Sequence, residues 1–312
     1  MSRAVVWIVA GAALLAAVVL TLAGLGDDPA VVPNWQALVL GLVQGATELL
    51  PISSSGHLIL VPWVGDWEYL KEHDAFNQTF DVSLHLGTLV AVVVYFRADI
   101  VRLARAWFGS VRRRRIESDD ERIAWYVAAA TVPAAIVGAL GENLIAENLG
   151  EPWQIAILLA IFGVLLWVAD RRPQTKGMQD VGWKAAFGVG LAQTLSLMPG
   201  VSRSGITITA GRFLGLDRDS AARFSFLLLV PITFGAVVYK GVGDVLLAEL
   251  PPGLAGPFVV GSAASFASAL VAISALLGYV RRRDYTVFAV YRVLIAVIVL
   301  LLIVTGVRSA EF

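Results

Sequence analysis

The sequence predicts an all-α polytopic membrane protein, and three observations support this fold class. The chain of 312 residues has only 15% charged residues, its mean hydropathy is +0.76, and apolar stretches recur along its whole length. A soluble chain carries about 25% charged residues. Because the membrane interior offers the backbone no water, apolar stretches of this length form helices that satisfy their own hydrogen bonds.

The composition also excludes several kinds of site. The formal net charge is zero, so nothing indicates a nucleic-acid partner. The chain has no cysteine, which excludes disulfides, thiol catalysis and thiolate metal ligands. Any bound metal would therefore have oxygen or imidazole ligands.

Continuous apolar stretches predict the transmembrane helices. The first, residues 5–25, follows Arg3 and could be a signal peptide. Its length and the lack of a convincing cleavage site favour an uncleaved helix. The other predicted spans are residues 80–97, 123–140, 154–170, 221–241, 257–280 and 287–307.

Two further apolar stretches, residues 35–64 and 184–216, differ in kind. Each is broken midway by proline, glycine and serine. Unwound backbone at membrane depth is tolerated only where protein or water satisfies it. Each stretch therefore predicts a half-helix, a break and a second half-helix.

Basic residues predict the orientation of the spans, because they accumulate in cytoplasmic loops. They cluster at 97–115, 171–184 and 281–283, so residues 98–122 are expected to form a cytoplasmic loop. The opposite loops carry acidic residues, which are Asp27, Asp28, Asp66, Glu68, Glu72, Asp74, Glu142, Glu147, Glu151, Asp244 and Glu249. This assignment gives the first broken stretch two outer ends and the second two inner ends. Both would be re-entrant hairpins, entering from opposite faces.

The two broken stretches are also related in sequence. LVQGATELLPISSSG (42–56) aligns with LAQTLSLMPGVSRSG (191–205) at an offset of 149 residues. We therefore predict two inverted-topology repeats, each a re-entrant hairpin plus three transmembrane helices, whose shared site lies near the midplane. The predicted units are an extra N-terminal transmembrane helix with an outer linker (1–34), the first repeat (35–170, hairpin 35–64) and the second repeat (171–312, hairpin 184–216).

The first break combines an acidic helix face with a helix N-terminus. Gln44 and Glu48 lie at positions i and i+4 of one helix face, and Pro51 ends that half-helix. The residues that follow are suited to cap the next helix and to allow close approach to its amides. They are Ser53, Ser54, Ser55 and Gly56, and His57 falls in the first turn.

The second break, PGVSRSGIT (199–207), repeats this logic with Arg203 between two serines. Free amides at a helix N-terminus bind anions, serine hydroxyls add donors, and arginine adds a bidentate fork that suits phosphate. Two such ends facing each other predict a phosphate or diphosphate cradle.

Simpler structural roles compete with this hypothesis. A serine cluster at a break is most often only a cap, an arginine can pair with a carboxylate, and a histidine can bond a carbonyl group. Because ionisable groups inside a membrane are costly, Glu48, His57 and Arg203 at two matched breaks favour function. Asp81 and His85 also share a helix face. An interface or packing role is expected for them, and a supporting role at the site is the alternative.

The quoted motifs carry a family resemblance. QGATELLPISSSGHL and PGVSRSGITITAGRFLG, with FDVSLHLGTLVAV (80–92) and FSFLLLVP (224–231), resemble the bacitracin-resistance type of undecaprenyl-diphosphate phosphatase over about residues 35–307. The resemblance implies a multi-pass enzyme of the cell membrane. It would remove the terminal phosphate of C55 isoprenyl diphosphate, recycle the lipid carrier for cell-wall precursors and confer bacitracin resistance. The site would face outward.

The resemblance also implies roles for individual residues. Glu48 is expected to be the general base or a metal ligand, Ser54 the nucleophile or an anion donor, and His57 the acid/base group or a diphosphate clamp. Arg203 neutralises charge on the transferred phosphoryl group. The supporting phosphate donors are Ser53, Ser55, Gly56, Ser202, Ser204 and Thr207.

The cofactor and the partners follow from the same resemblance. A divalent cation, Mg²⁺ or Ca²⁺, is expected at Glu48 and Gln44, where Gln44 stands in place of the first carboxylate of the acidic pair. The expected partners are the isoprenyl diphosphate lipid and membrane lipids, with a homodimer as a further candidate. Attack by serine and attack by water both remain open. A polyprenyl-phosphate transporter is the alternative function, because inverted repeats with broken helices are also the architecture of carriers.

Overall fold

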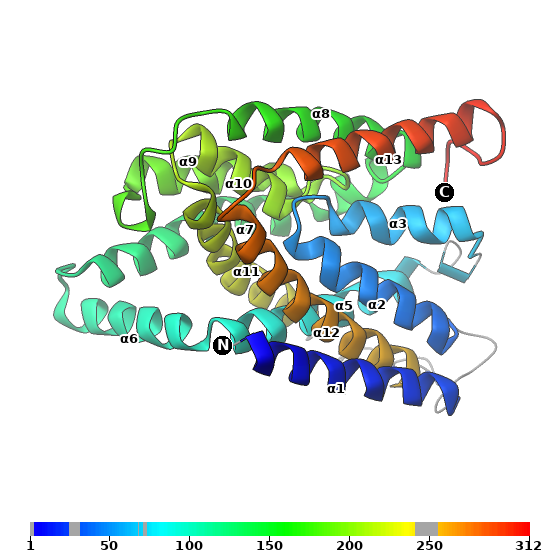
Figure 1. Ribbon diagram of the computed structural model, residues 1–312, viewed down its shortest axis with the longest axis horizontal. Coiled ribbons are helices and arrows are strands. Elements are labelled where there is room, and N and C mark those ends of the chain that lie inside the picture. The colour runs from blue at the N-terminus through cyan, green and yellow to red at the C-terminus, as the bar shows by residue number, and fades with distance from the viewer. Residues whose placement is uncertain (1–2, 25–31, 68, 71–73, 241–254) are drawn as a thin grey trace.

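The computed structural model describes the chain apart from residues 1–2, 25–31, 68, 71–73 and 241–254, and apart from the side chains of residues 3, 74–78 and 142–147. Its named elements in the described residues are all helices (Figure 1). They are α1 (Arg3–Leu22), α2 (Asn34–Leu49), α3 (Ser54–Gly65), α5 (Asp74–Tyr95), α6 (Arg97–Arg113), α7 (Asp119–Asn148), α8 (Pro152–Asp170), α9 (Trp183–Thr194), α10 (Arg203–Phe213), α11 (Arg218–Lys240), α12 (Ala255–Val280) and α13 (Thr286–Val304), with 3₁₀ turns at Met178–Asp180 and Leu195–Leu197.

The helices confirm a polytopic membrane protein. Among the described residues, six helices are long and apolar enough to cross a membrane, namely α1, α7, α8, α11, α12 and α13. A seventh crossing is obtained if α5 and α6 are counted together as one bent span. The acidic residues Asp27, Asp28, Glu68, Glu72, Asp244 and Glu249, which predicted outer loops, lie outside the described residues.

The prediction of a loop over residues 98–122 is wrong for most of its length, because Arg97–Arg113 forms helix α6. This helix turns by 83° from α5. Its apolar side chains recur at helical spacing, and Leu103 packs with Ala124 of α7 and Leu227 of α11. Burial of this face explains why the arginine-rich segment is helical.

Both broken stretches are interrupted in the structure. The first break, residues 50–53, separates α2 from α3, and the second break, residues 198–202, precedes α10. The four helices of these stretches have 16, 12, 12 and 11 residues, whereas a transmembrane helix needs about 20. Each break ends on a serine with a φ of 77° that caps the next helix, Ser53 or Ser202. A positive φ is unusual for serine and is typical of functional sites.

Helix α2 packs closely against α12 through small residues. Gly41 and Gly45 lie one turn apart, and a Cβ atom on Gly45 would lie 2.7 Å from the backbone nitrogen of Ala269. On Gly41 it would lie 2.8 Å from the Cβ atom of Ala264. Small residues allow such backbone approach between membrane helices. The contact fixes the half-helix that carries Glu48.

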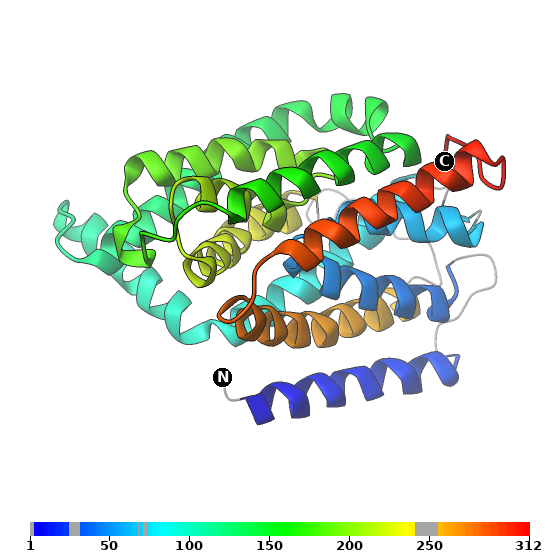
Figure 2. The same cartoon turned by 45° about the horizontal axis from the view of Figure 1, so that its top comes forward.

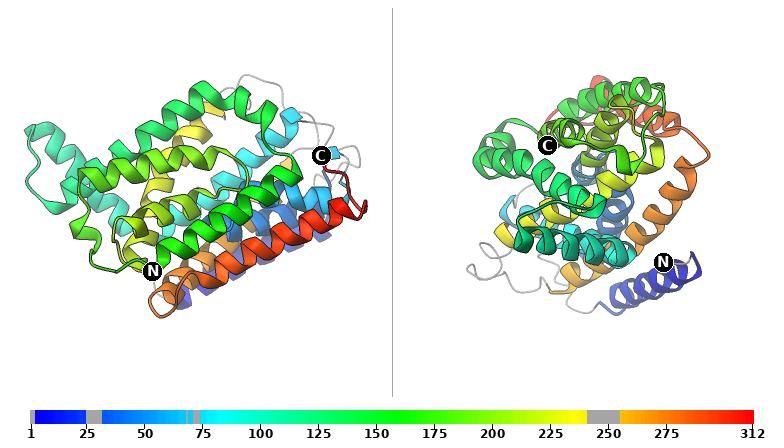
Figure 3. Two further views of the ribbon diagram at one scale, coloured as in Figure 1. Left: turned by 90° about the horizontal axis from the view of Figure 1, so that it is seen from above. Right: turned by 90° about the vertical axis from the view of Figure 1, so that its left-hand side faces the viewer.

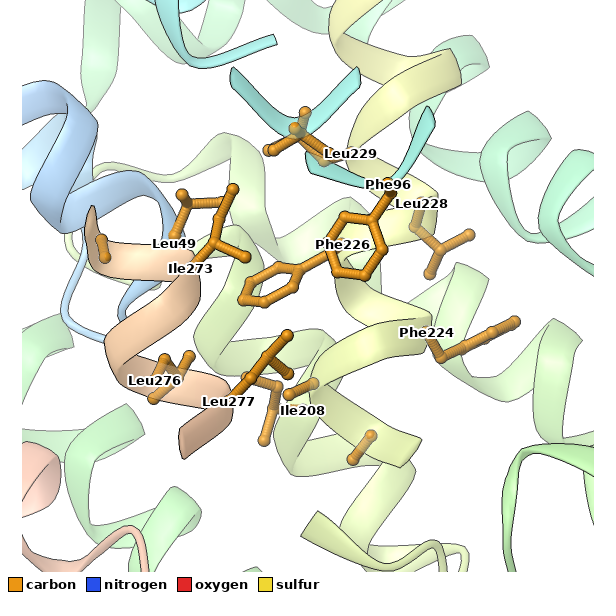
Figure 4. Close-up of a cluster of buried hydrophobic side chains, with 14 of the residues drawn as sticks. Leu49, Phe96, Ile208, Phe224, Phe226, Leu228, Leu229, Ile273, Leu276 and Leu277 are labelled. Carbon is orange, nitrogen blue, oxygen red and sulfur yellow. The ribbon is translucent and has the colours of Figure 1, made fainter. Parts of the chain in front are cut away.

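A shared apolar core joins the two interrupted stretches. Leu49 of α2 and Ile208 of α10 lie in one cluster with Phe226 of α11 and Ile273 of α12 (Figure 4). Helix α1 lies at the edge of the molecule beside α12 (Figure 2), and α8 runs beside α13 (Figure 3). One half-helix of each broken stretch, α2 and α10, therefore packs into the same apolar core.

One buried carboxylate joins four helices at the far end of α10. Asp170, the last residue of α8, accepts hydrogen bonds from Arg212 Nε (3.1 Å), Arg218 Nε (2.8 Å) and the backbone nitrogen of Tyr285 (2.9 Å). These partners come from α10, α11 and the residue that caps α13. The network anchors α10 at the end opposite the second break.

Candidate active site

Glu48 is the centre of the polar cluster between the two breaks. It lies in the last turn of α2 and is only 6% exposed. Its Oε1 atom accepts hydrogen bonds from Arg203 Nε (3.3 Å) and Nη2 (3.1 Å). Its Oε2 atom accepts hydrogen bonds from Ser54 Oγ (2.5 Å) and Gln44 Nε2 (3.3 Å). Four of the predicted residues therefore meet here.

The two second half-helices begin at this carboxylate. Ser54 is the first residue of α3 and Arg203 is the first residue of α10, and the offset of 149 makes them equivalent positions. Each side chain bonds a different oxygen of Glu48. The N-termini of α3 and α10 therefore both lie close to the carboxylate of Glu48. Helix N-termini favour anions.

Three of the predicted phosphate donors, Ser53, Ser202 and Ser204, form hydrogen bonds within and between the two breaks. Ser53 Oγ accepts hydrogen bonds from the backbone nitrogens of Gly56 (3.4 Å) and Gly200 (3.1 Å), which joins the two breaks. Ser202 Oγ caps α10 by accepting from the backbone nitrogen of Gly205 (3.0 Å). Ser204 Oγ donates to the carbonyl oxygen of Leu50 in the first break (2.9 Å).

Two further predicted donors, Thr207 and Ser55, lie on α10 and α3. Thr207 Oγ1 donates to the carbonyl oxygen of Arg203 (2.7 Å) and contacts Ser225 Oγ (2.8 Å). The same segment of α11 accepts Arg203 Nη1 at the carbonyl oxygen of Ser225 (2.8 Å). Ser55 is half-buried at the second position of α3. The guanidinium of Arg203 is thus fixed from both ends.

His57 is predicted to join the acid and the guanidinium, but its ring is engaged elsewhere. It lies in the first turn of α3 and is 7% exposed. Its Nδ1 atom lies 2.7 Å from the carbonyl oxygen of Ser53, and its Nε2 atom lies 2.8 Å from the hydroxyl of Tyr291. Within the described residues, none of its hydrogen bonds reaches Glu48 or Arg203.

His85 lies beside the carboxylate of Glu48, which a role in packing alone does not explain. Its Nε2 atom is 3.6 Å from Glu48 Oε2, and its Nδ1 atom is 2.7 Å from the carbonyl oxygen of Asp81. The geometry favours the supporting role at the site, which the sequence offered only as the alternative. No sequence pattern distinguished this histidine from one that faces a neighbouring helix.

Arg292 is the residue that sequence reasoning missed. It is fully buried on α13 and donates to carbonyl oxygens in both breaks. These are Pro51 (Nη1, 3.1 Å), Gly200 (Nη2, 2.8 Å) and Val201 (Nη2, 3.0 Å), and its Nε atom also donates to Leu159 of α8 (3.1 Å). A lone arginine inside the apolar stretch 287–307 was the available signal, because such residues are rare and functional in membrane spans.

Two buried side chains near the breaks, Gln44 and Glu48, carry oxygen donors of the type that hard divalent cations bind. Gln44 is fully buried, and its Oε1 atom has no hydrogen-bond partner within the described residues. Glu48 supplies carboxylate oxygens beside it. No group of three or more metal-ligating side chains occurs in the same part of the chain. A cation that uses few protein oxygens and several substrate oxygens matches this set.

Comparison with known proteins identifies the family of this chain. A family model described as Bacitracin resistance protein BacA matches residues 37–298. Two similar proteins, both named undecaprenyl-diphosphatase, come from Gemmatimonas aurantiaca (45% identical over 266 residues, 85% of this chain and 96% of the relative) and Rubrobacter xylanophilus (44% identical over 266 residues, 85% and 96%). The matched region contains both breaks and every residue of the cluster around Glu48. The chain therefore belongs to the BacA family of bacitracin resistance proteins.

Proposed function

We propose that this protein is a membrane-embedded undecaprenyl-diphosphate phosphatase. It hydrolyses undecaprenyl diphosphate to undecaprenyl phosphate and inorganic phosphate, which recycles the lipid carrier for cell-wall synthesis and confers bacitracin resistance. The observation that carries the proposal is the meeting of two helix N-termini and Arg203 at the single carboxylate of Glu48. The relatives that share this region bear the name of this activity.

The proposal gives each group at the site a role in the reaction. The diphosphate binds at the N-termini of α3 and α10. Glu48 accepts the proton of Ser54 Oγ, its closest partner at 2.5 Å, as that oxygen attacks the terminal phosphorus. The bond from this phosphorus to the bridging oxygen breaks, and undecaprenyl phosphate leaves. Arg203 compensates charge on the transferred group, and water then hydrolyses the phosphoserine.

His57 and the cation complete this proposal. Because the carbonyl oxygen of Ser53 holds Nδ1, Nε2 is the nitrogen of His57 that can gain or lose a proton during the reaction. A Mg²⁺ or Ca²⁺ ion would be held by Glu48 and by Gln44 Oε1, and it would neutralise phosphoryl charge. Gln44 supports this assignment because its buried Oε1 atom lacks a partner in the described residues.

Phosphate release from purified protein tests the activity and the metal together. We expect the protein in detergent to release phosphate from C55 and shorter isoprenyl diphosphates, and EDTA to lower the rate at least about tenfold until Mg²⁺ or Ca²⁺ is restored. Protein with Glu48→Ala, prepared identically, controls for contaminating phosphatases. If the wild-type protein releases no phosphate, the proposed phosphatase function is wrong. Movement of polyprenyl phosphate across vesicles without hydrolysis would favour the transporter instead.

We also propose that the two broken stretches are re-entrant hairpins of inverted-topology repeats. The constant offset of 149 residues, the shared φ of 77° at Ser53 and Ser202, and the equivalent positions of Ser54 and Arg203 support this arrangement. The inverted orientation rests on the distribution of basic residues.

Cysteine accessibility tests the orientation, because the native chain has no cysteine. Single cysteines at Trp35 and Asp66, at the two ends of the first hairpin, are expected to react with an impermeant maleimide in intact cells. Cysteines at Lys184 and Phe213, at the ends of the second, should react only after permeabilisation. All four positions are exposed. Labelling of the two ends of one hairpin from opposite sides would exclude a re-entrant structure.

A further inference from the structure

We propose that Tyr291 is a positioning residue for the imidazole of His57, an inference that rests on the proposed phosphatase function. Neither the sequence motifs nor the cluster around Glu48 includes this tyrosine. It lies on α13, far from His57 in sequence, and its hydroxyl is 2.8 Å from His57 Nε2. The two rings are stacked, with centroids 5.7 Å apart and planes inclined by 11°.

The contacts of His57 determine which nitrogen carries the proton of the neutral ring. The carbonyl oxygen of Ser53, 2.7 Å from Nδ1, can only accept a hydrogen bond. Nδ1 must therefore bear hydrogen, and Nε2 of the neutral imidazole must be an acceptor. The hydroxyl of Tyr291 then donates to Nε2. The ring is held in one tautomer and one orientation by partners on both of its nitrogens.

A phenol is suited to this position because it can serve both charge states of the imidazole. It donates to Nε2 of the neutral ring and accepts from the N–H of the protonated ring. Within the described residues, the Tyr291 hydroxyl has His57 as its hydrogen-bond partner. His57 therefore keeps its orientation whether or not Nε2 carries a proton.

Arg292, the residue after Tyr291, restrains the part of α13 that contacts His57. Its side chain bonds carbonyl oxygens of both breaks, so this turn of α13 is tied to the segments that form the site. Tyr291 is 37% exposed, whereas Arg292 is fully buried. Two consecutive residues of α13 thus position the breaks and the imidazole.

Nitrogen NMR measures the predicted hydrogen bond without relying on catalysis. The full-length protein with ¹⁵N-labelled histidine is compared with its Tyr291→Phe variant, which keeps the ring and loses the hydroxyl. We expect the His57 Nε2 resonance to move towards that of an acceptor nitrogen without a hydrogen bond, while Nδ1 stays protonated. His57→Gln identifies the resonances. His85, whose Nδ1 has the same type of carbonyl partner, is the internal reference and should not move.

Kinetics then measure whether this orientation matters for turnover. We expect Tyr291→Phe to lower kcat for phosphate release about tenfold, as loss of one hydrogen bond to an acid/base group implies, with little change in KM. Replacement of Tyr291 by 4-aminophenylalanine, which restores a donor at the same place, should recover most of the rate. Tyr239→Phe, at an exposed tyrosine of α11 (64%), is the matched control.

The outcomes separate this proposal from the proposed function. An unchanged Nε2 resonance in Tyr291→Phe, or a changed resonance with wild-type kcat, overturns the positioning role. Equal losses in Tyr291→Phe and Tyr239→Phe overturn it as well, because the effect is then not specific to His57. If the wild type releases no phosphate, the phosphatase function fails, while the NMR result still decides whether Tyr291 fixes the imidazole.

Discussion

Replacing Glu48 or Arg203 with alanine is expected to lower the rate of phosphate release by about a thousandfold or more. Their side chains form a salt bridge at 3.1 Å that joins the acid of the first stretch to the cation of the second. Removing a positioned cation at the transferred phosphoryl group costs this much in comparable reactions. Loss of Glu48 also removes the acceptor for the proton of Ser54.

The single variants need a control for stability, because each leaves a buried charge without its partner. Glu48 and Arg203 are both nearly buried, with side chains 7% and 10% exposed, and removing one partner of such a pair costs about 3–5 kcal/mol. The double variant Glu48→Leu with Arg203→Leu removes both charges and should unfold closer to the wild-type temperature. It should remain inactive. Wild-type-like turnover in any of these variants rejects the assignment.

Conservative variants separate the charge from the geometry. Arg203→Lys keeps the positive charge but loses the fork that reaches Glu48 through two nitrogens, so partial activity is expected. Glu48→Gln keeps the size of the side chain but cannot accept a proton from Ser54. Its rate should therefore stay near that of Glu48→Ala. Release of phosphate by Glu48→Gln at half the wild-type rate or more would contradict the role of Glu48 as base.

The sequence predicts the local features of this site well because they depend on short-range chemistry. A proline or glycine followed by serines ends one helix and caps the next, and both breaks fall where the motifs place them. The offset of 149 residues predicts which positions are equivalent. The contact between Glu48 and Arg203 agrees with the expectation that both breaks face one point.

The features that the sequence does not predict depend on tertiary contacts. The orientation of the His57 ring is set by a tyrosine on α13, and the proximity of His85 to Glu48 is set by the packing of α5. Basic residues predict that the segment 98–122 is cytoplasmic but do not show that its apolar side chains pack on α7 and α11. Gly41 and Gly45 form a helix-packing pattern, yet only the structure shows that α12 is their partner.

Replacing Arg292 with leucine is expected to destabilise the protein and to inactivate it. The guanidinium donates to four carbonyl oxygens, three of them in the two breaks. The three carbonyl groups in the breaks, those of Pro51, Gly200 and Val201, have no helical partners because the helices are interrupted there. Each buried acceptor that loses its donor costs about 1–3 kcal/mol, so the free energy of unfolding should fall by several kcal/mol after partial relaxation. Thermal unfolding in detergent measures this loss.

The same substitution should lower the rate more than stability alone explains. Displacement of a reacting group by about 1 Å can cost a hundredfold in rate, and Arg292 fixes the two breaks that place Ser54 and Arg203 at Glu48. We therefore expect about a hundredfold loss at temperatures where the variant is still folded. Arg105→Leu, at an exposed arginine of α6, is the matched control and should leave both unfolding and rate unchanged. If folded Arg292→Leu protein turns over at the wild-type rate, the breaks hold their geometry without the arginine, and the preorganisation of the site must come from the hydrogen bonds of Ser53 and Ser204 between them.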